Sequence, residues 1–195
     1  MDEMTAADVS PITARLDALV AVAERTNARI TLEHVPFLAQ VDLRLDPSLA
    51  ARAPYPLPIE PNTAWEVGPR AALWLGPDEW LILGPPHTGP EIVREFDGAL
   101  ADVHRSVVDV SANRVGVELG GTDRFELLSH VCSLDLDPRV WSEGRCAQTL
   151  LGKTQAILHE RAETTGMLVR PSFAQYLVDR LLAAADTFDA EGTNI

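Results

Sequence analysis

The segment at residues 106–136 constrains the fold most, because it sets two strands and a helix close together along the chain. An apolar run at 107–110 and an alternating pattern at 115–119 predict two strands joined by a polar turn. Two glycines end the second strand, and the Thr122 hydroxyl is a candidate cap for a short helix. The apolar stripe of that helix consists of Phe125, Leu128 and Val131. The segment is strongly patterned for structure and contains no obvious reaction chemistry.

The chain has 195 residues, of which 46% are hydrophobic and 23% charged, so it can bury a core and predicts one domain, with or without a small lobe. No apolar run approaches the ~18–20 residues that span a bilayer. The acidic N-terminus lacks the basic and apolar regions of a signal peptide. Cys132 and Cys146 have no metal or redox spacing and are expected to be reduced core residues. These features predict a cytoplasmic protein.

The formal net charge of −13 argues against nucleic acid and against an anionic membrane surface as partners, since binding to either needs an excess of lysine and arginine. Solubility alone explains an acidic surface, and we favour this interpretation. A basic partner protein is the alternative.

The first forty-five residues predict a helix followed by two strands. Ser10-Pro11 is typical of a helix start, and apolar residues at helical spacing extend the helix to about Arg25. The residues expected to face inward are Ile12, Leu16, Leu19 and Ala23. A short strand at 29–34 and a half-buried antiparallel strand at 37–45 follow.

Residues 46–62 form a proline-rich arm with five prolines. This density predicts an extended surface connection, with neither a helix nor an interior strand. Two interpretations stay open. The arm is a simple loop, which we favour, or it is a stiff segment that lies on a partner at low entropic cost.

Residues 71–75 and 80–83 predict a hairpin around a type I turn at Pro77-Asp78. Pairing Leu75 with Trp80 makes both faces of the hairpin apolar. One face then carries Leu73, Leu75, Trp80 and Ile82, and the other carries Trp74, Leu81 and Leu83. Such a hairpin is either central in the sheet with helices over it, or has one face against another chain, and we favour burial within the chain.

Two further helices and three strands complete the pattern. Thr88 and Glu91 form a capping-box pattern at the start of a helix at 89–102, and Ser172 is expected to cap a final helix. The inward residues of that final helix are Tyr176, Leu177, Leu181 and Ala184. The strands are expected at 146–151, 154–160 and 167–170. The interspersed elements predict an α+β fold with a mostly antiparallel sheet packed with helices.

The domain organisation follows from the patterned part of the chain. We expect a single domain at 10–185, which includes the proline-rich arm at 46–62. The segments at 1–9 and 186–195 lack periodicity and are expected to be disordered tails.

Reaction motifs are absent from the sequence. No dinucleotide or phosphate-binding glycine motif, nucleophile elbow or zinc-helix motif is present, and the five histidines lie far apart. No catalytic, cofactor-binding or metal-binding residue is therefore predicted, although a metal site assembled in space stays an alternative of low weight.

Asp109 is the most suggestive carboxylate, because apolar residues flank it on both sides. It could hold a positively charged ligand nitrogen, or it could close the turn by accepting hydrogen bonds from the region of Ser111 and Asn113, which we favour. Arg170 could likewise meet a ligand carboxylate, although a solvated or ion-paired arginine is more common. His159 lies in a strand pattern and is expected to cap a sheet face rather than to act in acid–base chemistry.

The four tryptophans, at 65, 74, 80 and 141, are many for a chain with so few aromatic residues. Indole rings favour cores and interface centres alike. Together with the two-faced hairpin, the proline-rich arm and the missing reaction chemistry, they favour a subunit of a complex.

Several blocks of sequence carry a more specific resemblance. They are LWLGPDEWL at 73–81, VVDVSANR at 107–114, GGTD at 120–123, LDLDP at 134–138, EGRCAQT at 143–149 and LVRPSFAQYL at 168–177. In this order the chain resembles the gamma subunit of heterotetrameric sarcosine oxidase over roughly residues 37–185. The resemblance leaves out the N-terminal tail and the proline-rich arm.

The resemblance implies a non-catalytic structural subunit, inactive in isolation, with alpha, beta and delta subunits as partners. That complex oxidises sarcosine with oxygen to glycine, formaldehyde and hydrogen peroxide, or to 5,10-methylenetetrahydrofolate when folate is present. FAD, FMN, NAD and folate are expected on the large subunits and zinc on the smallest, with no cofactor on this chain. The implied fold is similar to the folate-binding domain of aminomethyltransferases.

Two alternatives stay open. One is a stand-alone folate-dependent one-carbon transferase, which would need a pocket over the sheet with Asp109 or a nearby carboxylate at its floor. The other is the same subunit in a sister complex that oxidises another N-methylated amine.

Overall fold

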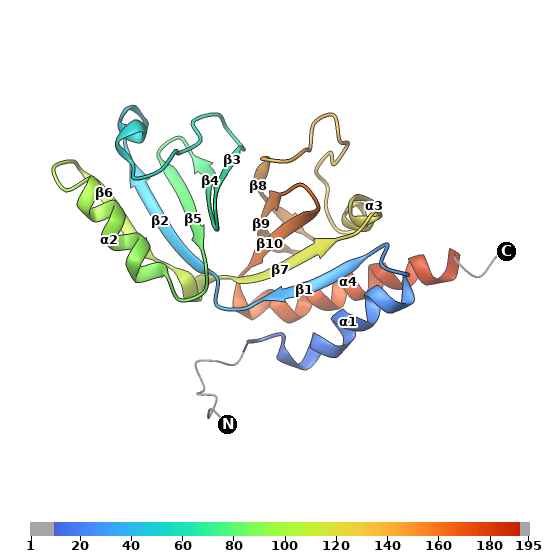
Figure 1. Cartoon of the computed structure of the whole chain (residues 1–195). Helices are drawn as coiled ribbons and strands as arrows, with labels where there is room; N and C mark the ends of the chain where they lie inside the picture. Colours follow the sequence, from blue (N-terminus) through green and yellow to red (C-terminus); the bar gives the residue numbers. More distant parts are fainter. Residues whose placement is uncertain (1–9, 192–195) are drawn as a thin grey trace, which may run out of the picture.

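The computed structural model describes residues 10–191, and they form two five-stranded sheets with helices on the outer faces (Figure 1). Sheet A has the strand order β1 (Thr31–Val35), β7 (Val115–Gly120), β10 (Thr164–Val169), β9 (Thr154–Glu160) and β8 (Cys146–Leu151). Sheet B has the order β3 (Ala64–Val67), β4 (Arg70–Gly76), β5 (Glu79–Gly84), β2 (Ala39–Leu45) and β6 (Arg105–Asp109). Neighbouring strands are antiparallel in both sheets. The α+β class predicted from the sequence is confirmed, with the strands divided between two sheets.

The layers are held by three apolar cores. The first lies between sheet A and the helices α1 (Leu16–Arg25), α3 (Arg124–Ser129) and α4 (Pro171–Glu191). The second lies between sheet B and α2 (Gly89–Ala99) together with the arm. The third joins sheet B to sheet A. The chain is therefore a four-layer sandwich in which helices cover the outside and the two sheets face each other.

The β4–β5 hairpin is buried on both faces, as the sequence predicts. Ala72, Trp80 and Ile82 pack toward α2, while Leu73 and Leu81 pack toward sheet A. The predicted pairing of Leu75 with Trp80 is wrong, because Trp74 lies opposite Trp80 and the register shifts between Trp74 and Gly76. The second face is covered by another sheet, whereas the sequence suggested helices or a second chain.

The proline-rich arm is more ordered than expected. It begins with a 3₁₀ helix at Pro47–Arg52, which corrects the prediction of a segment without helix. The Asp46 carboxylate accepts a hydrogen bond from the Ser48 amide at 2.9 Å, and proline is tolerated at the first helical position. Further along, the indole Nε1 of Trp80 donates to the Pro58 carbonyl at 2.7 Å, which ties the arm to sheet B.

The helix starts also differ from the sequence prediction. A 3₁₀ turn at Thr13–Arg15 precedes α1. Leu16, which was expected to face inward, is partly exposed, whereas Val22 is buried. The Thr88 hydroxyl donates to the Pro85 carbonyl, so it forms no capping box with Glu91. The Thr122 hydroxyl likewise donates to the neighbouring Asp123 instead of capping α3.

The far ends of two helices differ as well. The helix expected at 89–102 ends at Ala99. In contrast, α4 continues past residue 185 to Glu191 and buries Phe188 against the first core, so part of the segment expected to be a disordered tail is helical. The tail expected at 1–9 and residues 192–195 lie outside the described residues.

Candidate functional site

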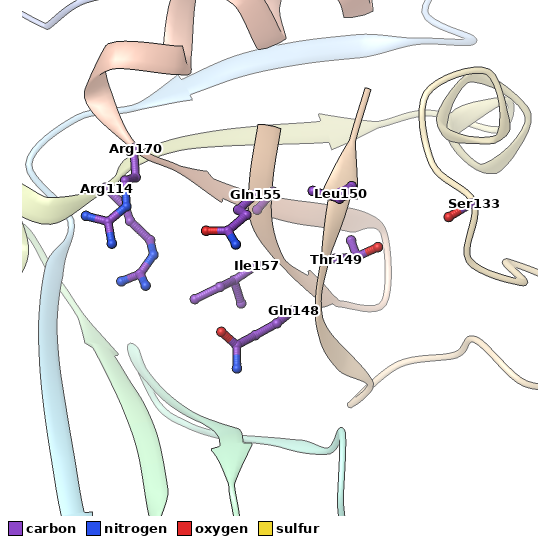
Figure 2. A pocket seen from close by; sticks show the side chains of 9 residues that line it. Arg114, Ser133, Gln148, Thr149, Leu150, Gln155, Ile157 and Arg170 are labelled. Atoms are coloured by element: carbon purple, nitrogen blue, oxygen red, sulfur yellow. The ribbon is translucent and has the colours of Figure 1, made fainter. Parts of the chain in front are cut away.

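A polar cleft opens where the third core reaches the edge of the two sheets (Figure 2). Its volume is about 450 Å³. Residues at the end of β10, at the start of β7, in the hairpin of β8 and β9 and in the loop after α3 line it: Arg114, Ser133, Gln148, Thr149, Leu150, Gln155, Ala156, Ile157 and Arg170. Figure 2 shows both arginines and the amides of Gln148 and Gln155 extending into the same space, beside the Ile157 side chain. We call it the arginine cleft.

Strand pairing brings the two arginines together. Val115 of β7 lies opposite Val169 of β10, so the residues just outside this pair, Arg114 and Arg170, emerge at the same edge of sheet A. The buried Gln40 side chain holds the backbone there, since its Nε2 donates to the Arg114 carbonyl at 2.8 Å. The position of Arg114 is thus fixed by sheet A on one side and by sheet B on the other.

Arg114 is a half-buried cation without a close partner. Within residues 10–191 its guanidinium forms no hydrogen bond and no ion pair. Its pKa is lowered from the ordinary value mainly by burial and further by the positive charge of Arg170, while Asp42 and Glu79 oppose this change. Burial and a like charge both disfavour the cation, so an anion placed between the arginines would be stabilised by them.

Arg170 is exposed and lies immediately before α4. Its Nη1 donates to the Asn113 side-chain oxygen at 2.7 Å, and across the described part of the chain it has no carboxylate partner. Among the described residues Arg170 is thus solvated and not ion-paired, which agrees with the favoured interpretation of a solvated or ion-paired arginine. Its place in the cleft agrees with the hypothesis that it could meet a ligand carboxylate.

Asp109 is not part of this cleft. Its Oδ1 accepts hydrogen bonds from the Ser111 amide at 3.0 Å and from the Ser111 hydroxyl at 2.6 Å, which confirms that it closes the turn. Asn113 contacts Arg170 instead of Asp109. The other Asp109 oxygen lies against the backbone of Gly89 at the start of α2, so the structure separates the two candidate charged residues of the sequence.

His159 lies on β9 of sheet A, close to Glu66 on β3 of sheet B. Only 2% of the residue is exposed. Burial lowers its pKa to about 3, with a smaller effect of the Arg161 charge. Its Nε2 is 3.6 Å from Glu66 Oε1, but Glu66 is already 2.9 Å from Arg161 Nε, so the imidazole is neutral and the contact is not an ion pair. The burial agrees with the expected role on a sheet face.

Both cysteines are free and buried, as predicted. The Cys146 thiol donates to the Thr63 carbonyl at 3.2 Å, and burial raises its pKa to about 12. No group of three metal-ligating side chains occurs among the residues that the structure describes.

The sequence did not single out Arg114, Gln148 or Gln155. Arg114 and Arg170 are far apart in the chain, and only the pairing of β7 with β10 makes them neighbours. No local pattern carries that information, so the cleft required the structure.

Comparison with known proteins places the chain in a family. The family model for the gamma subunit of sarcosine oxidase matches residues 44–187, a range that includes the whole proline-rich arm and so corrects the expectation that the resemblance leaves the arm out. The chain belongs to the sarcosine oxidase gamma subunit family.

Individual members of this family are similar over nearly the whole chain. The sarcosine oxidase gamma subunit of Corynebacterium sp. (strain U-96) is 33% identical over 186 residues, which cover 91% of this chain and 90% of the relative. The subunit of Arthrobacter sp is 30% identical over 84% of this chain and 83% of its own length.

Two solved structures relate the fold to known proteins. A chain of the heterotetrameric sarcosine oxidase from Corynebacterium sp. U-96, in complex with pyrrole 2-carboxylate, superposes with a TM-score of 0.82 and 31% identity, covering 93% of this chain and 96% of that one. The glycine cleavage system aminomethyltransferase T from Bartonella henselae reaches a TM-score of 0.63 at 12% identity, covering 91% of this chain and 55% of that one. The second likeness concerns the fold alone, and it confirms the aminomethyltransferase-like fold expected for a sarcosine oxidase gamma subunit.

Proposed function

We propose that this chain is the gamma subunit of a heterotetrameric sarcosine oxidase and that it acts there as a non-catalytic structural subunit. The observation that carries the proposal is the match to a chain of such a complex over 93% of this chain and 96% of the other. A match that covers nearly the whole of both chains favours the same role in the same kind of assembly.

An exposed apolar surface beside the proline-rich arm supports a role in assembly. Ile59 is 71% exposed and Trp65 is 52% exposed, and Val67 lies two residues further along β3 on the same face. We call these three residues the arm patch. Ile59 and Trp65 also border a hollow of about 560 Å³ lined by apolar residues of the arm. Large exposed apolar side chains that adjoin one another are typical of protein–protein contacts, with aromatic residues at their centres.

Two potentially reactive side chains, Cys146 and His159, are held in unreactive states, which favours a role without chemistry of its own. A Cys146 thiol with a pKa of about 12 is protonated at neutral pH, so it is a poor nucleophile. A buried histidine with a pKa of about 3 cannot exchange protons near neutral pH.

The family resemblance extends the proposal to partners and cofactors. The partners are the alpha, beta and delta subunits, and FAD, FMN, NAD, tetrahydrofolate and zinc belong to subunits other than this one. Sarcosine would be oxidised there for one-carbon metabolism in the cytoplasm. Within residues 10–191 no helix is both long and apolar enough to cross a membrane.

Co-expression with the three partner subunits tests the structural role. We expect that omission of this chain lowers the yield of assembled complex, its flavin content and its turnover of sarcosine. A complex that lacks this chain and keeps full flavin content and full turnover would contradict the proposal.

A pair of matched variants tests the arm patch. The double variant Ile59→Ser/Trp65→Ser should fold with a melting temperature close to that of the wild type but co-purify poorly with the other subunits, because both side chains are exposed. Val20→Ser changes an equally exposed residue on α1, which should leave assembly intact. Equal recovery of both variants in the complex would remove the arm patch from the proposal.

The aminomethyltransferase-like fold favours examining the folate alternative as a second candidate. In the form predicted from the sequence it placed Asp109 or a nearby carboxylate at a pocket floor, whereas Asp109 closes the turn after β6 and lies against Gly89 at the start of α2. Calorimetric titration of the full chain with tetrahydrofolate tests this candidate. Turnover of the complex with a set of N-methylated amines separates sarcosine from the substrates of a sister complex.

A further inference from the structure

We propose that the arginine cleft binds a small organic carboxylate through Arg114 and Arg170. This inference concerns a ligand of the chain itself and does not depend on the proposed role in assembly. It rests on the charge, the shape and the lining of the cleft.

The charge in the cleft is positive and only partly compensated. Asp42 and Glu79 are the carboxylates whose charge reaches Arg114, and neither forms an ion pair with it. Glu79 is instead 2.8 Å from Arg44. Burial raises the pKa of Asp42, and one of its oxygens is buried without a hydrogen-bond partner in the described chain. Two guanidiniums that share a cleft in this way favour an anionic ligand.

The chemistry of the walls favours a carboxylate on a carbon skeleton over an inorganic anion. The planar guanidinium matches the two oxygens of a carboxylate, and the amides of Gln148 and Gln155 offer further donors and acceptors. The buried Ile157 and the Leu150 side chain supply apolar surface beside these polar groups. The cleft is thus mainly polar, and its one apolar side offers a surface for the carbon skeleton of a ligand.

The size and closure of the cleft favour a small molecule over a segment of a partner protein. A volume of about 450 Å³ lies in the range of small-molecule pockets. The Gln148 side chain donates to the Leu75 carbonyl at 2.9 Å and so spans from sheet A to sheet B at one end. This bridge would block an extended chain from running through the cleft.

Calorimetric titration of the full chain with glutarate tests the proposal, with glutaramide as the uncharged analogue. We expect saturable binding of glutarate, no binding of glutaramide, and weaker binding at higher salt concentration. Arg170→Gln and Arg114→Gln should each weaken the binding about 10- to 100-fold, because each removes a charged hydrogen-bond donor. Arg180→Gln removes the same charge from an exposed position on α4 and should leave the affinity unchanged.

Arg170 is exposed, so Arg170→Gln should fold normally, and its melting temperature checks this. Failure of glutarate to bind would overturn the proposal, as would binding that neither cleft variant weakens. The same titration of the purified complex, with each cleft variant in place of this chain, gives the second criterion. If the arginine-dependent binding disappears on assembly, a partner carboxylate fills the cleft and the small-molecule proposal is wrong.

Discussion

The two ends of the surface between sheets A and B are built in different ways. At the closed end, Leu73 and Leu81 of sheet B pack against sheet A around Cys146, and the Ala64 amide donates to the Gly144 carbonyl at 2.7 Å. At the open end the arginine cleft holds two like charges and exposed amides. The closed end excludes water and buries the His159 ring, whose two nitrogens have no hydrogen-bond partner within residues 10–191, whereas the open end leaves charged groups accessible.

This difference separates what holds the sheets together from what is left for recognition. Apolar burial contributes roughly 25 cal/mol per Å² of surface removed from water, so the closed end accounts for most of the attraction between the sheets. A pair of like charges adds none. The residues of the cleft are therefore available for a ligand, and substitutions should cost much more stability at the closed end than at the open end.

The largest effect is expected at the closed end. Leu73→Ala removes a fully buried side chain and should lower the free energy of unfolding by about 2–5 kcal/mol. Leu150→Ala is the matched control at the open end, where the side chain is 52% exposed, and should cost less than about 0.5 kcal/mol. Chemical denaturation measures both changes. Equal losses for the two variants would show that the ends are alike.

A second prediction concerns the acid side of the stability curve. The pKa of His159 is about 3 in the folded chain, against an ordinary value of 6.5, so between these values the unfolded chain binds a proton that the folded chain does not. The stability that the neutral His159 side chain gives to the folded chain is fully present above pH 6.5. It is lost as the pH falls toward 3, by about 1.4 kcal/mol per pH unit at the steepest point.

His159→Phe should therefore flatten the dependence of unfolding free energy on pH between 6 and 4. Part of the slope should remain, because burial also lowers the pKa of His34. The measurement is denaturant unfolding at a series of pH values. An unchanged slope in the variant would mean that His159 takes up its proton without opening the closed end.

The hydrogen bond between the Gln148 side chain and the Leu75 carbonyl, at the edge of the cleft, should contribute less to stability. Gln148→Ala removes the hydrogen bond to the Leu75 carbonyl and should cost about 0.5–1 kcal/mol, since the bond is exposed and water can replace it. Gln155→Ala, whose side-chain amide has no partner within residues 10–191, should be close to neutral. Thermal unfolding compares the two, and a larger loss for Gln155→Ala would reverse the assignment of the bridge.

Local elements were predictable where the chain signals both ends of an element. The strands at 146–151 and 154–160 were predicted with the bounds that the structure shows, because the two apolar patterns are separated by a two-residue turn. The end of α4 was not predictable, since Phe188 is the only large apolar residue between residue 185 and the end of the helix at Glu191. A single residue defines no periodicity.

Tertiary arrangement was less accessible from the sequence. The two apolar faces of the β4–β5 hairpin indicate that both are covered, but periodicity does not say whether a helix, a sheet or another chain covers them. The sequence indicates Arg170 as a candidate ligand-binding residue but gives no sign that Arg114 lies beside it. The two are neighbours only because Val115 pairs with Val169. Site residues that come from paired strands far apart in sequence require the register, which no local pattern fixes.

The smallest effect on stability is expected from Arg170→Gln, and it gives the sharpest test of the contrast between the ends. The substitution loses an exposed hydrogen bond to Asn113, but it also removes the positive charge that disfavours the Arg114 cation. The two changes oppose each other, so the free energy of unfolding should stay within about 0.5 kcal/mol of the wild type. Denaturant unfolding at low and high salt measures the free energy of unfolding. Salt weakens the repulsion of exposed charges, so any stability that the variant gains from losing this repulsion should be smaller at high salt. A loss above about 1.5 kcal/mol would mean that Arg170 helps to hold the sheets together, and the cleft would then belong to the same structural surface as the closed end.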